Sequence, residues 1–218
     1  MNKLNTVLVR YKKFDNPLSI LTKSYGSDKG SPIDDDISLS GWKTHLYTDI
    51  YHMLFFGMRN SVSNVLEVGL GTNNDDVLSN MGSNGLPGAS LRAFRDYFPN
   101  ANIYGADIDE RVLFEEDRIK TFYVDQTNPA TIYNMLVDTG VDEFDIILDD
   151  GLHTHEAAVT LLENSFYKLK SGGIYIIEDV MYHWQTVKMY LEGHGYNFMH
   201  IDFGDDCSHI FVIFKTTV

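Results

Sequence analysis

The stretch VLEVGLGTNN at residues 65–74 places an apolar run directly before two glycines, Gly69 and Gly71. Glycines at the end of a strand permit a tight turn and let a ligand approach the backbone closely. A dinucleotide site has a third glycine three residues after the second, and this chain has Asn74 there. We therefore interpret the stretch as a buried strand followed by a turn that binds a nucleoside-like cofactor.

The segment behind this turn, DDVLSNMGSNGLPG at residues 75–88, is a long polar loop. A pyrophosphate binds best where a helix N-terminus follows the turn closely, and a loop of this length supports such binding poorly. S-adenosylmethionine carries no phosphate and does not need that helix. The loop and Asn74 favour S-adenosylmethionine over NAD, with an NAD-dependent oxidoreductase as an alternative.

From about residue 64 onward, short apolar runs alternate with longer segments that have helical spacing. This alternation indicates an α/β fold, a Rossmann-like doubly wound sheet that is mostly parallel. The last two runs are separated only by the short turn GDDCS, which suits a C-terminal antiparallel hairpin. Seven strands are expected, in the runs NVLEVGL, ANIYGADI, IKTFYVD, FDIILDD, GGIYIIED, YNFMHIDFG and HIFVIFKTT.

The segment THEAAVTLLENSFYKLKSGG at residues 154–173 has its apolar residues on one helical stripe. We expect a helix there that closes with the pair Gly172 and Gly173, because glycine commonly ends a helix. Residues 1–60 do not follow the alternation, and their aromatic and apolar residues have helical spacing only at the end. We expect a loop and helix cap over the active site at 1–60, and the Rossmann-like domain at 61–218.

Polar side chains follow the second and third predicted strands. Asp107 ends the second strand, where a carboxylate can accept two hydrogen bonds from a ribose diol, and Asp109 is the reserve candidate. Asp125 and Gln126 end the third strand and are candidates to contact adenine. Aspartate also commonly starts a loop after a strand, so ordinary turns are the competing interpretation.

The fourth and fifth predicted strands end in acids, Asp149 and Asp150 on one, Glu178 and Asp179 on the other. Neighbouring strands would bring these carboxylates together, where they repel unless a cation neutralises them. Oxygen ligands favour Mg²⁺, and Asp150, Glu178 and Asp179 are the candidate ligands. A hydroxyl bound to such a cation is easier to deprotonate.

His153 follows Asp150 by three residues and is the candidate general base, because a histidine can take a proton near neutral pH. His155 is the competing candidate. The alternative is that His153 is an ordinary residue at the start of a helix and that the acids only begin loops. The acids beside His153 favour the catalytic interpretation.

The chain carries 31 acidic and 17 basic residues, a net charge of −14. Such a surface repels nucleic acid and anionic lipid, so neither is expected as a partner. The single cysteine, Cys207, can form no internal disulfide and is expected to be inert. No signal peptide or membrane span is recognisable, so a cytoplasmic location is the default expectation. The sequence does not decide between a monomer and a homo-oligomer.

Several segments resemble a known family, and they follow one another in the same order over most of the chain. That family is the class I S-adenosylmethionine-dependent methyltransferases, here the metal-dependent O-methyltransferases of macrolide sugars and their cephalosporin-hydroxylase-like relatives. The segments are YGSDKG (25–30), HLYTDIYHMLF (45–55), LEVGLGTNN (66–74), GASLRAFRDYFPNANIYGADID (88–109), FYVDQTN (122–128), DDGLH (149–153) and IIEDV (176–180).

The resemblance implies that Asp150, Glu178 and Asp179 hold magnesium and that His153 is the base. It also implies a small-molecule or sugar acceptor in a natural-product or surface-polysaccharide pathway. The chain departs from the family at Leu152, where a small polar residue is common. The predicted cofactor site comprises Tyr47, Glu67, Gly69, Gly71, Ser90, Asp107, Asp125, Gln126 and Asp149.

Two further alternatives stay open. The first is a methyltransferase that acts on oxygen or nitrogen without a metal, in which the acids bind an amine or orient a hydroxyl. The second is a nucleoside-binding protein without catalytic activity. The complete set of acids and histidine argues against the second, because binding alone has no evident need for it.

Overall fold

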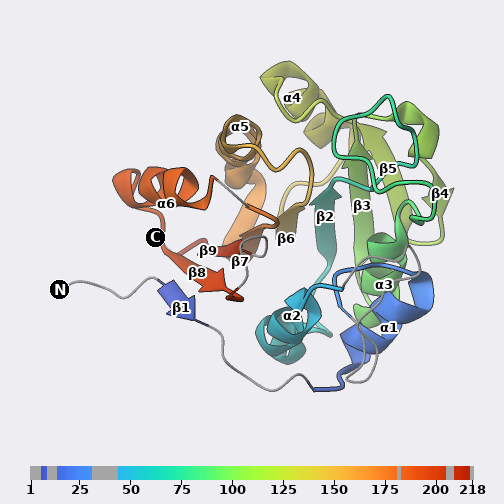
Figure 1. Ribbon diagram of the computed structural model, residues 1–218, viewed down its shortest axis with the longest axis horizontal. Coiled ribbons are helices and arrows are strands. Elements are labelled where there is room, and N and C mark those ends of the chain that lie inside the picture. Colours follow the sequence, from blue (N-terminus) through green and yellow to red (C-terminus); the bar gives the residue numbers. More distant parts are fainter. Residues whose placement is uncertain (1–5, 9–13, 31–43, 181–182, 205–208, 217–218) are drawn as a thin grey trace.

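The structure is a computed structural model that describes residues 6–8, 14–30, 44–180, 183–204 and 209–216. A single sheet runs through the molecule with helices on both sides (Figure 1). Five parallel strands form its centre, in the spatial order β7, β6, β2, β3 and β5. These strands span Leu169–Ile177, Phe144–Asp149, Asn64–Val68, Asn102–Asp107 and Ile119–Tyr123.

The C-terminal end of the chain adds two strands beside β7. Strand β9 (His209–Phe214) lies next to β7 and runs antiparallel to it, and β8 (Phe198–Asp202) pairs antiparallel with β9. The predicted α/β fold and the predicted C-terminal antiparallel hairpin are therefore confirmed. Six of the seven predicted apolar runs contain one of these strands, and the seventh, GGIYIIED at residues 172–179, covers the last six residues of β7.

The predicted number of seven strands is wrong, because the described residues form nine. The two additional strands are short edge strands, β1 (Thr6–Leu8) beside β8 and β4 (Glu115–Glu116) beside β5. Three and two residues are too few to show an apolar alternation in the sequence. Their pairing partners define them as strands, not their own pattern.

Three helices cover each face of the sheet (Figure 1). Helices α1 (Pro17–Tyr25), α2 (Tyr47–Phe55) and α3 (Ala89–Tyr97) bury their apolar residues in one core cluster. Helices α4 (Pro129–Asp138), α5 (His155–Ser165) and α6 (Trp184–Gly193) do so in the other. Short 3₁₀ turns occupy Phe56–Met58, Glu110–Val112 and Phe166–Lys168.

Local signals explain where several helices begin. Asn16 caps α1, its side chain accepting from the backbone N–H of Ser19 at 2.9 Å, and Asn128 caps α4 just before a proline. These side chains satisfy N–H groups that lack a helical partner. Among the described helices, none is long and apolar enough to cross a membrane.

The predicted end of the helix at residues 154–173 is wrong. Helix α5 ends at Ser165, and the glycine pair lies inside β7. Strand β7 starts early because Leu169, fully buried, pairs with Phe144 of β6, and an irregularity then shifts the register of the two strands. Gly172 has φ +77°, a backbone that favours glycine, so the pair permits this irregularity instead of ending a helix.

Candidate active site

A cleft of about 680 Å³ opens at the carboxyl ends of the parallel strands. A cleft of this size suits a small-molecule ligand. Its wall includes residues that follow β2, β3, β5, β6 and β7, together with N-terminal residues 26–29. Gly69, Gly71, Ser90, Asp107, Asp125 and Gln126 of the predicted cofactor site line it. The other three predicted residues, Glu67, Asp149 and Tyr47, are buried and are not part of its lining.

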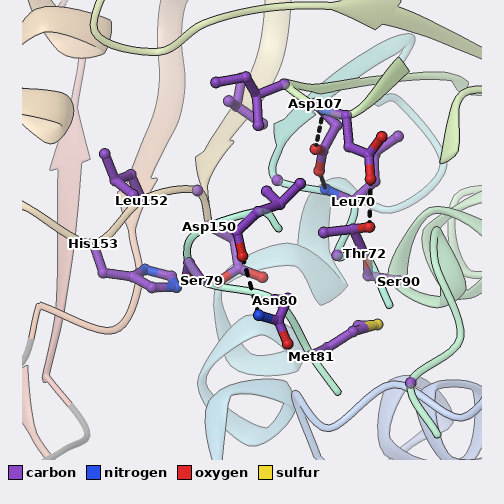
Figure 2. A pocket seen from close by; sticks show the side chains of 18 of the residues that line it. Leu70, Thr72, Ser79, Asn80, Met81, Ser90, Asp107, Asp150, Leu152 and His153 are labelled. Carbon is purple, nitrogen blue, oxygen red and sulfur yellow. Dashed lines mark hydrogen bonds between the residues drawn. The ribbon is translucent and has the colours of Figure 1, made fainter. Parts of the chain in front are cut away.

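The cleft has two ends. In the view of Figure 2, Asp107 lies at one end and His153 at the other, with Asp150 between them. The first end follows β2, β3 and β5, and we call it the turn end. The second follows β6 and β7, and we call it the acid end.

At the turn end, both glycines have a positive φ that favours glycine, and Gly69 also has a close backbone neighbour. Gly69 has φ +99°, and a Cβ atom there would lie 2.0 Å from the backbone oxygen of Asp150. Gly71 has φ +75°, and a Cβ atom there would lie 2.3 Å from the Cε of Met81. The glycine at 69 therefore lets the loop after β6 approach the turn, so it joins the two ends of the cleft.

Asp107 and Asp109 differ in how their carboxylates are occupied. The two oxygens of Asp107 each accept one backbone N–H, from Leu70 at 2.7 Å and from Asp109 at 2.9 Å. Asp109 accepts side-chain bonds from Thr72 at 2.6 Å, Asn74 at 2.7 Å and Arg111 at 2.6 Å. Asp107 thus keeps lone pairs for a ligand. Asp109 is engaged in shaping the turn, and its bonds to Arg111 hold its pKa well below the usual range.

The loop at residues 75–88 folds back over the turn. The Met81 backbone N–H donates to Thr72 at 2.9 Å, and the Asn73 side chain donates to Gly82 and Gly85. Residues 76–81 consequently line the cleft, with Ser79, Asn80 and Met81 visible in Figure 2. The sequence analysis recognised the loop only as an obstacle to pyrophosphate binding and missed these residues as part of the wall.

Asp125 and Gln126 both contact their own surroundings. The Asp125 carboxylate accepts from the backbone and side chain of Thr127, which is the ordinary turn expected after a strand. The Gln126 amide donates to Asp149 and accepts from the Leu152 backbone N–H at 2.9 Å. Gln126 thus holds the loop that carries Asp150 and His153. Burial raises the pKa of Asp149 to about 6.

The acid end brings together Asp150, His153 and Asp179. One potential ligand atom from each lies within 4.8 Å of the other two, so they could share a metal ion. His153 and Asp179 have φ of +59° and +50°, which is uncommon for residues with a Cβ. Strained backbone of this kind concentrates at functional sites.

Glu178 and Glu67 are more completely buried than Asp150 and Asp179. Glu178 accepts from Lys29 and from the Tyr51 hydroxyl, each at 2.6 Å, and is almost completely buried. Glu67 accepts from the Ser90 hydroxyl at 2.7 Å. Of the three predicted metal ligands, Asp150 and Asp179 therefore group with His153, and Glu178 groups with a lysine and a tyrosine.

Lys29 is the central cation of the acid end, and the sequence analysis did not single it out. Its Nζ lies 2.6 Å from Asp150, 2.6 Å from Glu178 and 3.2 Å from Glu67, and the side chain is only 3% exposed. Its partners are as far as 149 positions away in the chain. The only sequence signal was the segment YGSDKG, which carried part of the family resemblance.

Two tyrosines of α2 complete the support from the N-terminal region. Tyr47 donates its hydroxyl to Asp179, and Tyr51, one helical turn later, donates to Glu178. Residues four apart lie on one face of a helix, so one helix holds both acids that follow β7. Tyr47, predicted to line the cofactor pocket, instead stacks on His45 and contacts Asp179.

Burial dominates the ionisation of these groups. Burial raises the pKa of Glu178 well above its usual value, although Lys29 counteracts it, and it raises the pKa of Asp150 in the same way. Burial alone lowers the pKa of Lys29, but Asp150, Glu178 and Glu67 outweigh it, so that this pKa is raised well above its usual value. Lys29 is therefore a stable cation among acids that outnumber it.

His155, the competing candidate for the base, lies in a packing position, and so does Trp184 at the start of α6. His155 is the first residue of α5, and its ring contacts Tyr190, whereas His153 lines the cleft. Trp184 stacks on His200 and His209, with ring centroids 5.0 Å and 5.2 Å away. Cys207 lies outside the described residues.

No family model matches the chain. It is 31% identical over 163 residues to the 8-demethyl-8-alpha-L-rhamnosyl tetracenomycin-C 2'-O-methyltransferase of Streptomyces olivaceus, across 75% of this chain and 37% of the relative. It is 34% identical over 136 residues to the demethylmacrocin O-methyltransferase of Streptomyces fradiae, across 62% of this chain and 32% of the relative. The chain thus spans less than two fifths of the length of these curated relatives.

Among solved structures, the chain is similar to a methyltransferase of the mycinamycin biosynthetic pathway, MycE, crystallised in complex with Mg and SAH. The TM-score is 0.59 and the identity 28%, and the match covers 80% of this chain and 40% of that one. The likeness therefore extends over most of the sheet and its helices but concerns only part of the larger protein.

Proposed function

We propose that this chain, a protein with the class I methyltransferase fold and sequence similarity to sugar O-methyltransferases, is an S-adenosylmethionine-dependent O-methyltransferase. The predicted fold class and the predicted resemblance to macrolide-sugar O-methyltransferases are confirmed by the sheet and by the similar proteins. The chain matches only part of those relatives, so activity and acceptor are proposed for it here.

S-adenosylmethionine would bind at the turn end of the cleft. Asp107 has free lone pairs for the ribose hydroxyls, and Gly69, Gly71 and Ser90 line the adjoining wall. Glu67 and Asp149 would support this site from behind the wall, because both are buried. Ligands of open α/β sheets bind at the carboxyl ends of the strands, where these residues lie.

A divalent metal fits the acid end. Three carboxyl groups, Glu67, Asp150 and Glu178, contact the Lys29 ammonium, and Asp179 lies near Asp150, so the carboxyl groups outnumber the lysine beside them. Magnesium prefers oxygen ligands, and we propose Asp150, Glu178 and Asp179 as its ligands. The contacts of Glu178 with Lys29 and Tyr51 do not exclude it, because each carboxylate oxygen has two lone pairs. When bound, the metal makes a coordinated hydroxyl more acidic.

His153 would then take the proton of the acceptor hydroxyl. Its imidazole lines the cleft beside Asp150 and stays available as a base if the metal takes oxygen ligands. The hydroxyl oxygen forms a bond to the methyl carbon while the bond from that carbon to sulfur breaks, and the proton moves to a ring nitrogen of His153. The chain's contribution is to orient the hydroxyl and accept this proton.

The observation that supports the proposal best is that the turn end and the acid end belong to one cleft and lie next to each other. The backbone oxygen of Asp150 lies against Gly69, so a cofactor at the turn and an acceptor at the acids would meet there. The relatives are named as O-methyltransferases of a rhamnosyl tetracenomycin and of demethylmacrocin, and we propose a sugar hydroxyl as acceptor. Residues 1–60 would serve as a cap, since Lys29 and Tyr47 reach the acids.

The first experiment is a calorimetric titration with S-adenosylhomocysteine, the demethylated product, with NADH as the comparison ligand. We expect binding of the former at one site per chain and none of NADH. The absence of S-adenosylhomocysteine binding would overturn the proposal. Methyl transfer from labelled S-adenosylmethionine can then be assayed on the acceptors named in the relatives, rhamnosyl tetracenomycin C and demethylmacrocin.

A second candidate is methyl transfer without a metal, and Lys29 favours it. The lysine already supplies a positive charge to Asp150 and Glu178 in the structure. Exhaustive chelation separates the two candidates, because the metal-assisted reaction stops and the metal-independent one continues. Addition of MgCl₂ after chelation should restore only the former.

A further inference from the structure

Lys29 has no part in the metal-assisted methyl transfer proposed above, yet its ammonium lies among the candidate metal ligands. Its Nζ contacts a carboxylate oxygen of Asp150 and one of Glu178, both at 2.6 Å. Glu67 Oε1, which has no hydrogen-bond donor among the described groups, lies 3.2 Å from the same nitrogen. One cation thus connects the strand before the glycine turn with the acids after β6 and β7.

The backbone around Lys29 is held on both sides. Gly26 ends α1 in the left-handed region, and the Thr22 hydroxyl donates to the carbonyl of Gly30 at 3.0 Å. The Thr48 N–H at the start of α2 donates to the Lys29 carbonyl at 3.1 Å. A Cβ at Gly30 would lie 1.8 Å from the Thr48 hydroxyl, so the loop sits directly against α2. These contacts fix the backbone that carries Lys29 and thereby position its ammonium beside the acids.

The carboxyl groups at this end of the cleft outnumber the lysine and arginine side chains that contact them, and a further cation would favour their ionised forms. Among the described residues that line the cleft, the other lysine or arginine is Arg111, which pairs with Asp109 and Asp76. Lys29 therefore faces Glu67, Asp150 and Glu178 alone, with Asp179 nearby as a fourth acid. Buried carboxylates without a compensating cation are strongly destabilising.

We propose that Lys29 is an internal counter-ion of the candidate metal site. It is a positioning residue that holds Asp150 and Glu178 together. Its positive charge offsets part of the negative charge of these carboxylates, and a bound divalent cation would offset the rest. The lysine and the divalent cation then act on the same carboxylates. Loss of the lysine leaves the cluster with one more uncompensated negative charge, so the protein without metal becomes less stable and gains more from a divalent cation. The assignment of that cation site rests on the proposed function.

The test compares the wild-type chain with Lys29→Met, which keeps an unbranched apolar stem and removes the ammonium. Thermal unfolding is measured after chelation and again with saturating MgCl₂. We expect the chelated variant to unfold at least about 10 °C below the wild type, since loss of one partner of a buried ion pair is among the larger single-residue effects. We expect MgCl₂ to raise the unfolding temperature of the variant more than that of the wild type.

Lys170→Met is the matched control. Lys170, whose side chain is half exposed, also pairs with a buried acid, Asp145, at 2.9 Å, but both lie at the starts of their strands, at the opposite end of the sheet. It should lose some stability and respond to MgCl₂ as the wild type does. An equal or smaller response of Lys29→Met to MgCl₂ would show an ordinary ion pair and overturn the proposal.

A second variant keeps the test decisive if Lys29→Met does not fold. The double variant Lys29→Met, Glu67→Gln removes one positive charge and one carboxylate that contacts it at 3.2 Å, and it leaves the three proposed metal ligands in place. We expect it to fold and to respond to MgCl₂ like the wild type, and failure of either expectation would also overturn the proposal. Wild-type titration with S-adenosylhomocysteine reports separately on the proposed function, because it does not depend on the charge of Lys29.

Discussion

The turn end and the acid end of the cleft are built in different ways. At the turn end, Asp107 accepts backbone N–H groups from Leu70 and Asp109, and Asp109 is held by Thr72, Asn74 and Arg111. These contacts join two neighbouring strands and the loops that follow them. The turn end is therefore a product of the parallel sheet itself.

At the acid end, the supporting groups come from the N-terminal region. Lys29, Tyr47 and Tyr51 contact acids that lie 121 to 149 positions later in the chain. These contacts are ionic or charge-assisted and are buried or partly buried, so their strength depends on how accurately the fold places the two partners. The difference indicates that cofactor binding and chemistry can be disturbed separately, and four variants test this separation.

The largest expected effect is on turnover. His153→Ala removes the proposed base, and kcat should fall by about 10²–10⁴-fold, the usual contribution of a positioned base. Affinity for S-adenosylhomocysteine should stay unchanged, because His153 lies away from the turn end. The control is His155→Ala, which alters a ring that packs on Tyr190. Equal losses in the two variants would remove His153 from its proposed role.

Asp149 lies between the two ends and gives a pH-dependent prediction. Burial raises its pKa from 3.8 to about 6, so the folded protein binds this proton more tightly than the unfolded chain. Ionisation of Asp149 therefore lowers the free energy of unfolding as pH rises from about 4 to about 6, by about 3 kcal/mol at most.

Asp149→Asn should remove this loss. The variant should be more stable than the wild type above about pH 6, and the difference should close as pH falls to about 4. Urea denaturation at a series of pH values measures it. A difference that is constant with pH would mean that Asp149 does not titrate as its burial suggests.

Gly69→Ala should disturb both ends together. The new Cβ would meet the backbone oxygen of Asp150, and alanine is strained at φ +99°. We expect a loss of more than about 2 kcal/mol in the free energy of unfolding. Gly57→Ala is the control, because a Cβ there has open space. Similar stability of the two variants would contradict the close joining of the ends.

The smallest expected effect concerns cofactor affinity. Asp107→Ala should weaken S-adenosylhomocysteine binding by about tenfold or more, since hydrogen bonds to a charged group contribute about 1.5–3 kcal/mol. Asp125→Ala should have less effect, because Asp125 is more exposed to water than the buried Asp107, and a hydrated carboxylate gains less from a ligand's hydrogen bond. Calorimetry measures both affinities. The reverse order would mean that Asp125 contacts the adenine after all.

The fold could be predicted because its signals are local. Each of the seven apolar runs became a strand, and the parallel order followed from their alternation with helices. The errors arose where a partner decided the structure. Strands β1 and β4 exist through pairing, and Gly172 and Gly173 belong to β7 because of its register with β6.

The candidate site was predicted unevenly for the same reason. Asp107, Asp150, His153 and Asp179 could be found because each follows a recognisable strand. Lys29 and Tyr51 could not, because their partners are distant in the chain, and Glu67 and Tyr47 were placed in the wall of a cleft that they support from behind.

Composition, periodicity and turn chemistry were therefore sufficient for a mostly parallel sheet, its C-terminal hairpin and the edge where a ligand is expected to bind. These properties depend on residues within one or two elements of each other. The residues that an element buries are apolar and recur at the period of that element, so the sequence shows them as a repeating pattern. The ion pairs around Lys29 arise only in the folded chain. The fold also decides which acids contact Lys29, which contact the tyrosines of α2, and which face the cleft. Electrostatic contacts act at a few ångströms between residues that are far apart in sequence, and no repeating pattern records them.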